Sequence, residues 1–319
     1  LLLLGQDHRI LSINPAAQTL FGTDRSCIGR DFLTVDRRSD ISAAVDAALT
    51  QGHAQLRQQR QGREYQIDLS RIDSGGEVFG AVLLAFDVTE QAEAERMRRE
   101  FTANVSHELK TPLQSIIGSV ELLENDLVQP EDRPRFLGRI HQEAQRLVSL
   151  INDILGLSQL DEGAAMPRES VSLLSLAQEA AASLSAAAQA QNVTLTVNGT
   201  AGTLTGVRRL LSETVRNLCE NAVKYNVPGG SVTVTVAETP RAVTLTVADT
   251  GIGIPPADQS RVFERFYRVD KSHSRAIGGT GLGLSIVKHA VAYHHGTVQL
   301  DSTPGQGTVI TVTLPKDAA

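Results

Sequence analysis

The sequence predicts a multidomain α+β protein, built from a small α/β domain, an antiparallel helical hairpin that dimerises into a four-helix bundle, and a two-layer α/β sandwich. Three observations predict this fold class. Residues 1–88 alternate short apolar runs with turn residues, residues 89–165 carry two long amphipathic patterns, and residues 166–319 mix helical patterns with strand pairs. A chain of 319 residues is long enough for two to three domains with separate cores.

Charge and composition argue against several classes of function. The formal net charge is −6 and no basic stripe stands out, so nucleic acid is not an expected partner. The two cysteines lie far apart in sequence and suit a reducing compartment. No apolar run reaches the roughly 18 residues that a membrane span needs. Because the chain begins at Leu1 without an initiator methionine, we expect the cytoplasmic portion of a longer protein, which segments upstream could anchor in the cell membrane.

The first domain is expected to begin with a hairpin. Residues 1–4 and 9–13 are apolar runs joined by Gly5-Gln6-Asp7, which is typical of a turn between two strands. Asn14 then caps a short helix whose first residue is Pro15. A longer helix and three strands are expected to follow, at residues 41–49, 54–59, 64–71 and 78–86.

This order of elements resembles a PAS sensory domain. Asn14-Pro15-Ala16-Ala17 stands near its front and Asp87-Val88-Thr89-Glu90 at its exit. The resemblance implies that residues 1–88 respond to a signal, which the sequence leaves unknown. A ligand cavity and a purely structural dimerising role both stay open.

The second region is expected to be a helical hairpin. From Glu90 the composition changes to strong helix formers of mixed charge, and one continuous helix is expected over residues 89–126. Two prolines, Pro130 and Pro134, follow, and a second helix is expected over residues 133–160. Such a hairpin cannot cover its own apolar stripe. We therefore expect a homodimer, in which two hairpins form a four-helix bundle.

His107 lies on the first of these two helices. At about 100° per residue, one apolar stripe forms on that helix, and His107 lies roughly 180° from its centre. Glu108 is its neighbour, and Thr111 follows one turn later. A lone helical histidine of this kind is more often a solvated surface residue. The residues of the apolar stripe are Phe101, Val105, Leu109, Pro112, Ile116, Val120 and Leu123.

The third region is expected to be a two-layer sandwich, because helices alternate there with strands of a largely antiparallel sheet. Helices are expected at residues 171–190, 208–225 and 280–294. Strands are expected at residues 193–197, 231–237, 242–248, 297–302 and 308–314.

Two segments of this region carry polar groups suited to a nucleotide. Asn217, Asn221 and Lys224 share one face of a helix, and a neutral amide oxygen suits Mg²⁺ beside phosphate oxygens. Asp249 ends a strand and is followed by Gly251 and Gly253. An acid there can accept the amino hydrogens of an adenine while the glycines let the base approach.

Two more segments follow. Phe263-Glu-Arg-Phe266 precedes the glycine-rich run Gly278-Gly279-Thr280-Gly281-Leu282-Gly283. Glycines that open a helix expose backbone N–H groups to phosphate at the positive end of the helix dipole. Each of the four segments alone is a weak signal.

In order and spacing, these segments resemble the N, G1, F and G2 boxes of the histidine-kinase ATP-binding domain, which has the nucleotide fold of gyrase, Hsp90 and MutL, also called the Bergerat fold. The residues around His107 resemble the H box of the HisKA-type dimerisation and phosphotransfer domain of the same family. The motifs appear in family order and cover nearly all of residues 90–315. The chain is identified as a member of the sensor histidine kinases of two-component systems.

The resemblance implies a role for each residue. His107 would be the phosphoacceptor that attacks the γ-phosphoryl group of ATP, and Glu108 would accept its proton. Thr111 would orient water against the aspartyl phosphate of a response regulator. Asn221 would hold Mg²⁺ with Asn217 in support. The other implied nucleotide contacts are Lys224, Tyr225, Asp249, Gly251, Gly253, Gly279, Thr280, Gly281, Leu282 and Gly283.

The implied activity is ATP-dependent autophosphorylation of His107, followed by transfer to an aspartate in the receiver domain of a response regulator. Two rival functions stay open: an ATPase of the gyrase/Hsp90 class and a non-catalytic scaffold. Those ATPases use a glutamate to activate water, but Asn217 stands one turn before Asn221. A scaffold would need damaged motifs. A second histidine, His295, stands where the family commonly has glycine, and we read His294 and His295 as structural.

Overall fold

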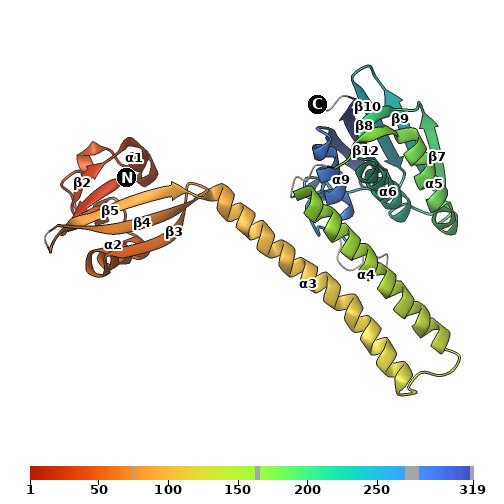
Figure 1. The fold of residues 1–319 in the computed structure, drawn as a ribbon, viewed down its shortest axis with the longest axis horizontal. Coiled ribbons are helices and arrows are strands. Elements are labelled where there is room, and N and C mark those ends of the chain that lie inside the picture. Colours follow the sequence, from red (N-terminus) through yellow and green to blue (C-terminus); the bar gives the residue numbers. More distant parts are fainter. Residues whose placement is uncertain (75, 162–165, 270–279, 317–319) are drawn as a thin grey trace. The chain divides into compact units, whose positions relative to one another are not determined.

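The computed structural model describes the chain except residues 75, 162–165, 270–279 and 317–319 (Figure 1). It divides into two compact units, Leu1–Glu100 and Phe101–Ala319. The sequence places domain boundaries after residues 88 and 165, and these two positions stay a prediction. No helix in the described ranges combines the length and the apolar character that crossing a membrane requires.

The first unit contains a five-stranded antiparallel sheet in the order β2-β1-β5-β4-β3. Its core joins this sheet to the helices, with Leu2 and Leu83 from strands and Ile41 and Val45 from a helix. Asn14 caps the first helix, as predicted, because its Oδ1 accepts a hydrogen bond from the Ala17 amide at 2.9 Å. The elements are β1 Leu2–Gly5, β2 Ile10–Ile13, α1 Pro15–Phe21, η1 Arg25–Cys27, η2 Phe32–Thr34, α2 Ser39–Gln51, β3 His53–Arg60, β4 Arg63–Ser74 and β5 Glu77–Asp87.

The junction between β5 and the next helix contains no loop. The sheet ends at Asp87 and α3 Thr89–Glu124 begins two positions later. The Thr89 hydroxyl donates to Asp87 at 2.6 Å and accepts from the Glu64 amide at 2.9 Å. The Val88 amide donates to the Glu64 carbonyl at 2.8 Å, and Arg63 pairs with Asp87 at 2.8 Å. The start of α3 is therefore fixed to β4 of the first unit.

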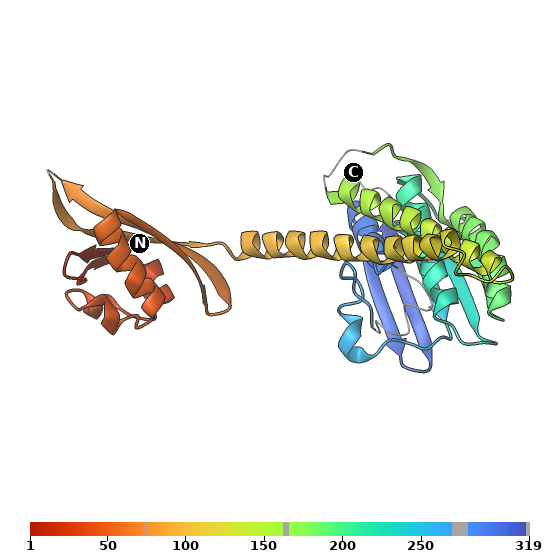
Figure 2. The ribbon, with the colours of Figure 1, turned by 90° about the horizontal axis from the view of Figure 1, so that it is seen from below.

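The predicted helical hairpin is confirmed, with α3 followed by α4 Arg133–Asp161. Figure 2 shows α3 as one unbroken helix, even though it contains Pro112. It ends at Glu124 rather than 126 because Asp126 takes a positive φ of 51°, which a right-handed helix cannot include. Arg133, the first residue of α4, contacts the carboxylate of Asp126 at 2.5 Å.

The remaining part of the second unit is the predicted two-layer sandwich. Three helices, α5 Leu173–Ala190, α6 Arg208–Lys224 and α9 Gly283–Tyr293, belong to one layer, and the sheet has the order β11-β12-β10-β9-β7. Only the β7–β9 pair of this sheet is parallel among the described strand pairs. One core of buried aliphatic residues joins the layers. The strands are β7 Thr194–Gly199, β9 Ser231–Glu238, β10 Ala242–Asp249, β11 Thr297–Thr303 and β12 Gly307–Pro315.

Four details differ from the prediction. Strands β6 Glu169–Ser172 and β8 Thr203–Gly206 form an unexpected small sheet, and α7 Pro256–Gln259 is an unexpected short helix. Helix α5 starts at Leu173 because residues before it belong to β6. Helix α9 starts at Gly283 rather than at residue 280, because Gly281 takes a positive φ of 70°.

Candidate active site

Helix α6 carries the first group of predicted site residues. Its apolar face, which includes Leu211 and Leu218, lies in the core. Asn217, Asn221 and Lys224 lie on another face of the helix and are half-buried. The amide nitrogen Nδ2 of Asn217 is buried, and the described residues offer it no hydrogen-bond partner. A buried donor without an acceptor costs about 1–3 kcal/mol, so this position favours an added acceptor such as a phosphate oxygen.

Asn217 also contacts the glycine-rich segment. A Cβ atom on Gly283 would lie 2.9 Å from the Asn217 side-chain oxygen, so only a glycine fits here without a shift. Gly283 is the first residue of α9. The first and last of the four predicted nucleotide segments are therefore in direct contact, as a shared site requires.

Asp249 is held in a defined orientation at the end of β10. Its Oδ1 accepts hydrogen bonds from the Gly251 amide at 2.8 Å and the Thr308 amide at 3.2 Å. Burial raises the pKa of this carboxyl group, and the two amide bonds oppose that shift. With Oδ1 occupied by two donors, Oδ2 is the oxygen that can accept a hydrogen bond from a ligand.

The turn after Asp249 packs against the end of α6. The Ile252 amide donates to the Tyr225 carbonyl at 3.1 Å. A Cβ atom on Gly251 would lie 2.3 Å from the same carbonyl oxygen, so the close approach depends on glycine. Gly253 takes a positive φ of 68° in this turn. The predicted adenine segment and the α6 segment thus adjoin each other.

Lys224 is a half-buried cation of this site. Burial lowers the pKa of its amine to about 8, and the positive charges of Arg268 and Arg146 act in the same direction. Its Nζ lies 5.3 Å from the centre of the Tyr225 ring. Burial also raises the pKa of the Tyr225 hydroxyl. A half-buried lysine crowded by other cations would be stabilised by a bound anion.

Thr280 links the glycine-rich segment to the helical hairpin. Its hydroxyl donates to Asp153 of α4 at 2.9 Å and accepts from the Leu282 amide at 3.2 Å. Burial raises the pKa of Asp153, and the bond from Thr280 opposes that shift. Gly281 accepts a hydrogen bond from the Phe266 amide at 2.9 Å. Gly279, which was also predicted as a phosphate contact, lies outside the described residues.

Apolar contacts accompany this link within the second unit. Leu282 is fully buried in a cluster with Leu150 and Leu157 of α4. The Phe266 ring packs against Phe101 of α3, with ring centres 5.7 Å apart. In this structure, the Phe266 ring therefore serves packing.

His107 is exposed on α3, on the side away from the predicted apolar stripe. Among the described residues, it forms no side-chain hydrogen bond or ion pair. Its carbonyl accepts a hydrogen bond from the Thr111 hydroxyl at 3.2 Å. Glu108 beside it pairs with Arg146 of α4, with 3.5 Å between Nη2 and Oε2. The imidazole is thus accessible next to a carboxylate whose position is restrained.

Sequence reasoning missed three residues of this region. Arg146 and Asp153 reach the site from α4, and only the relative placement of helix and sandwich reveals their contacts. Asn226 joins the end of α6 to β9, because its Nδ2 donates to the carbonyls of Ala222 at 3.1 Å and Ser231 at 3.0 Å. An asparagine directly after a predicted helix was the one available signal for Asn226.

The fold and the site together define a class of protein: an α/β sandwich with a candidate nucleotide site, joined to a helical hairpin that carries an exposed histidine. Comparison with known families agrees with each part. Residues 206–318 match the family "Histidine kinase-, DNA gyrase B-, and HSP90-like ATPase". Residues 97–163 match "His Kinase A (phospho-acceptor) domain", and residues 1–93 match "PAS fold".

Curated relatives give the same result. The chain is 39% identical over 242 residues to the sensor-like histidine kinase SenX3 of Mycolicibacterium smegmatis, covering 74% of this chain and 62% of the relative. It is 38% identical over 254 residues to the sensor histidine kinase WalK of Bacillus subtilis, covering 75% of this chain and 40% of the relative. The chain thus spans about half the length of the curated relatives it matches.

Solved structures share the fold. Full-length ShkA in complex with AMPPNP has a TM-score of 0.52 at 29% identity, covering 69% of this chain and 46% of that one. The histidine kinase ThkA, in complex with the response regulator protein TrrA, has a TM-score of 0.52 at 21% identity, covering 99% and 95%. This chain belongs to the sensor histidine kinases of two-component systems, with a PAS domain, a phosphoacceptor domain and an ATP-binding domain.

Proposed function

We propose that ATP held by the C-terminal domain phosphorylates His107, and that the phosphoryl group then passes to an aspartate in the receiver domain of a response regulator. The observation that carries this proposal is the bond from Thr280 of the glycine-rich segment to Asp153 of the hairpin that bears His107. It ties the nucleotide segments and the phosphoacceptor helix pair within one compact unit. The ThkA complex with TrrA supports a response regulator as the partner.

In this proposal, one neutral ring nitrogen of His107 attacks the γ-phosphorus of ATP. A P–N bond forms, the bond from the γ-phosphorus to the bridging oxygen breaks, and ADP leaves with that electron pair. Glu108 accepts the proton from the other ring nitrogen, which keeps the attacking nitrogen nucleophilic. Arg146 is a positioning residue in this step, because its ion pair fixes where the Glu108 carboxylate lies.

The nucleotide contacts follow from the donors and acceptors available. Asp249 Oδ2 accepts the amino hydrogen of adenine, Lys224 contacts phosphate, and the buried Nδ2 of Asn217 donates to a phosphate oxygen. Asn221 supplies an amide oxygen on the same helix face, which suits Mg²⁺ when phosphate oxygens and waters complete its shell. A bound Mg²⁺ would neutralise the charge that develops on the phosphates during transfer. The other predicted contacts are Tyr225, Gly251, Gly253, Gly279, Thr280, Gly281, Leu282 and Gly283.

The test is incubation of the whole chain with γ-labelled ATP and Mg²⁺, comparing wild type with His107→Gln. Wild type should acquire an acid-labile, base-stable label, and the variant should acquire none while still binding a fluorescent ATP analogue. Steady ATP turnover without a phosphoprotein would support the ATPase alternative. Failure of both proteins to bind the analogue would support a scaffold.

A reverse activity toward the regulator rests on Thr111. Its hydroxyl donates to the His107 carbonyl at 3.2 Å, and a rotation about χ1 would free it to orient water against an aspartyl phosphate. We expect Thr111→Ala to keep autophosphorylation and to slow dephosphorylation of the regulator by about tenfold or more. Thr111→Ser keeps the hydroxyl and should keep both activities. Equal loss of both activities in Thr111→Ala would contradict this role.

A further inference from the structure

A pocket in the first unit takes no part in the proposed function. It has a volume of about 510 Å³, within the range of small-molecule sites. Three segments line it: the end of α1, the stretch that leads into α2, and the end of β3. The lining residues are Leu20, Phe21, Gly22, Val35, Asp36, Arg37, Arg38, Arg60 and Gln61.

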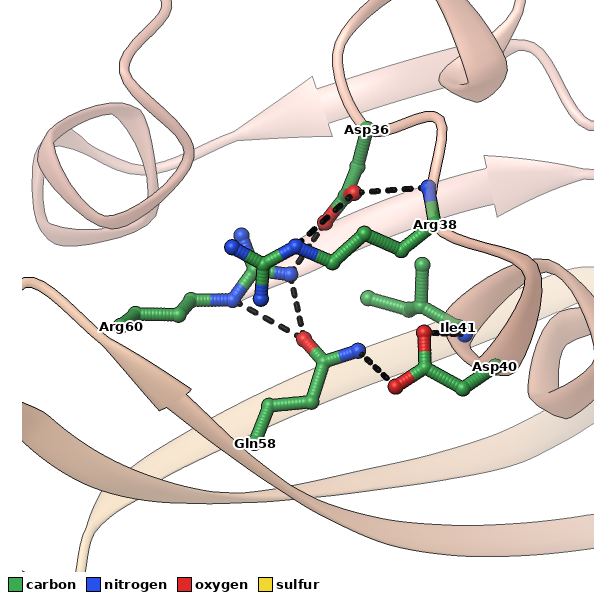
Figure 3. Close-up of polar contacts among 6 residues, drawn as sticks. All are labelled: Asp36, Arg38, Asp40, Ile41, Gln58 and Arg60. Atoms are coloured by element: carbon green, nitrogen blue, oxygen red, sulfur yellow. Dashed lines mark hydrogen bonds and ion pairs between the residues drawn. The ribbon is translucent and has the colours of Figure 1, made fainter.

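Three of the lining residues, Asp36, Arg38 and Arg60, belong to a network of polar contacts (Figure 3). Arg60 is only 8% exposed, and its Nη2 forms a short contact with Asp36. Its Nε donates to the Gln58 side-chain oxygen at 3.0 Å, and Gln58 in turn donates to Asp40 at 2.7 Å. The Arg60 guanidinium also lies 4.6 Å from the centre of the Phe21 ring. The arginine is therefore held rigidly at the pocket wall.

The charges of this network do not balance. The Asp36 carboxylate binds Arg60 and also faces the guanidinium of Arg38, whose Nε lies 4.0 Å away. Arg37 adds a third cation to the lining, so the lining contains three arginines and one aspartate and carries two excess positive charges. Asp40 nearby accepts from Gln58 and from the Ile41 amide, and counting it still leaves one excess positive charge. This excess stands out in a chain whose net charge is −6.

The lining also contains the apolar residues Leu20, Phe21 and Val35. We propose that this pocket binds a small organic carboxylate, with the carboxylate facing the arginines and its hydrocarbon part against the apolar residues. A guanidinium matches a carboxylate with two parallel hydrogen bonds. The apolar lining favours an organic acid over free phosphate, which has no hydrocarbon part to place there.

The test measures binding to the whole chain by calorimetry, with benzoate and hexanoate as probes and with benzyl alcohol, hexanol and inorganic phosphate as comparisons. Wild type should bind at least one carboxylate saturably and neither alcohol. Arg37→Gln/Arg38→Gln removes two exposed cations and leaves the Arg60–Asp36 pair in place, and it should weaken carboxylate binding by tenfold or more. Arg25→Gln/Arg30→Gln removes the same charge from exposed positions outside the lining, and it should bind like wild type.

Several outcomes would overturn the proposal. Absence of carboxylate binding would leave the Arg60–Asp36 pair as a purely structural contact. Phosphate binding as tight as that of the carboxylates would assign the pocket to inorganic oxyanions. Equal weakening in both double variants would indicate general attraction between charges rather than a site. A thermal unfolding scan of each variant shows whether it remains folded, and the binding readout does not depend on kinase activity.

Discussion

His294 sits between two hydrogen bonds that require its neutral ring. The residue is only 1% exposed. One ring nitrogen, Nδ1, lies 2.7 Å from the Ala290 carbonyl, so it carries the proton and donates. The other, Nε2, accepts from the Val207 amide at 2.9 Å. A second proton on Nε2 would place two donors against each other, so the fold selects the uncharged form.

Burial lowers the pKa of His294 below its ordinary value of 6.5, and Arg168 and His295 act in the same direction, while the bond to Ala290 opposes them. A group whose pKa is lower in the folded state stabilises the fold above its unfolded pKa and loses that contribution as the pH falls. Denaturant unfolding should therefore show lower stability at pH 5.5 than at pH 7.5. His294→Gln should cost about 1–3 kcal/mol at pH 7.5 and flatten this dependence. The exposed His141→Gln should keep the wild-type profile, and an unchanged profile in His294→Gln would contradict the assignment.

Lys224 predicts a pH dependence of nucleotide binding. Its amine has a pKa lowered to about 8 without nucleotide, and bound phosphate would raise that pKa by pairing with the charged form. The affinity for ATP should therefore fall as the pH rises through about 8, by roughly tenfold between pH 7.5 and pH 9. Equilibrium binding of a fluorescent ATP analogue measures this slope. Lys224→Met should be weaker and flat over this range, whereas the exposed Lys288→Met should keep the slope. A slope that persists in Lys224→Met would exclude this lysine as its source.

At the scale of elements, the spacing of apolar residues along the sequence predicted most helices and strands to within a few residues. The strands β6 and β8 were missed because each has only four residues and its pairing partner lies far away in the sequence. The start of α9 was misplaced because the sequence alone does not show which glycine of the run takes a positive φ. The contacts of Arg146 and Asp153 were beyond prediction for a similar reason, since they depend on how α4 lies against the rest of the second unit.

Helix α3 begins without a flexible loop after β5, and it contains no glycine or proline between Thr89 and Phe101. We expect the rotational position of its downstream face, here called its phase, to set the balance between kinase and phosphatase activities. A rigid helix transmits a rotation that a flexible linker would dissipate. Deleting residues 92–98 removes one heptad and should roughly preserve this balance. Deleting four residues rotates the downstream face by about 40°, and deleting three rotates it by about 60° in the opposite sense, so both should shift the balance.

Labelled phosphate on His107 and the rate of regulator dephosphorylation measure the two activities in each deletion variant. Identical behaviour of all three deletions would show that α3 does not act as a phase-sensitive connector. The seven-residue deletion also serves as the control for shortening as such, since it removes more chain than either of the other two.

At the scale of the whole molecule, the hairpin exposes a second apolar stripe that the single chain does not cover. Leu113 and Ile117 of α3 are 49% and 47% exposed, and Val148, Ile151 and Leu155 of α4 are 59%, 46% and 55% exposed. Their spacing of three and four residues places each group on one helix face. A stripe of this kind supports the expected homodimer, in which two hairpins form a four-helix bundle.

We expect the double variant Ile117→Glu/Ile151→Glu to be monomeric, because two dimer-related copies would bury four unpaired carboxylates. Light scattering after size-exclusion chromatography measures the mass in solution. Leu11→Glu changes a residue of the first unit that is 57% exposed, and this control should remain a dimer. A monomeric wild type, or a dimeric double variant, would contradict the assignment of this stripe as the interface.

The loop-free junction at Asp87 and Thr89 also bears on how such proteins diverge. A helix that follows a sheet strand without a loop is fixed in orientation at that end. Any change in its length therefore rotates the segment at its other end. A loop can gain or lose single residues during evolution. Helix α3 should instead gain or lose residues in steps of about seven, because other changes in length rotate one of its ends relative to the other. When recombination joins a new sensor domain to a kinase domain, we therefore expect connecting helices whose lengths preserve the same rotation between the two.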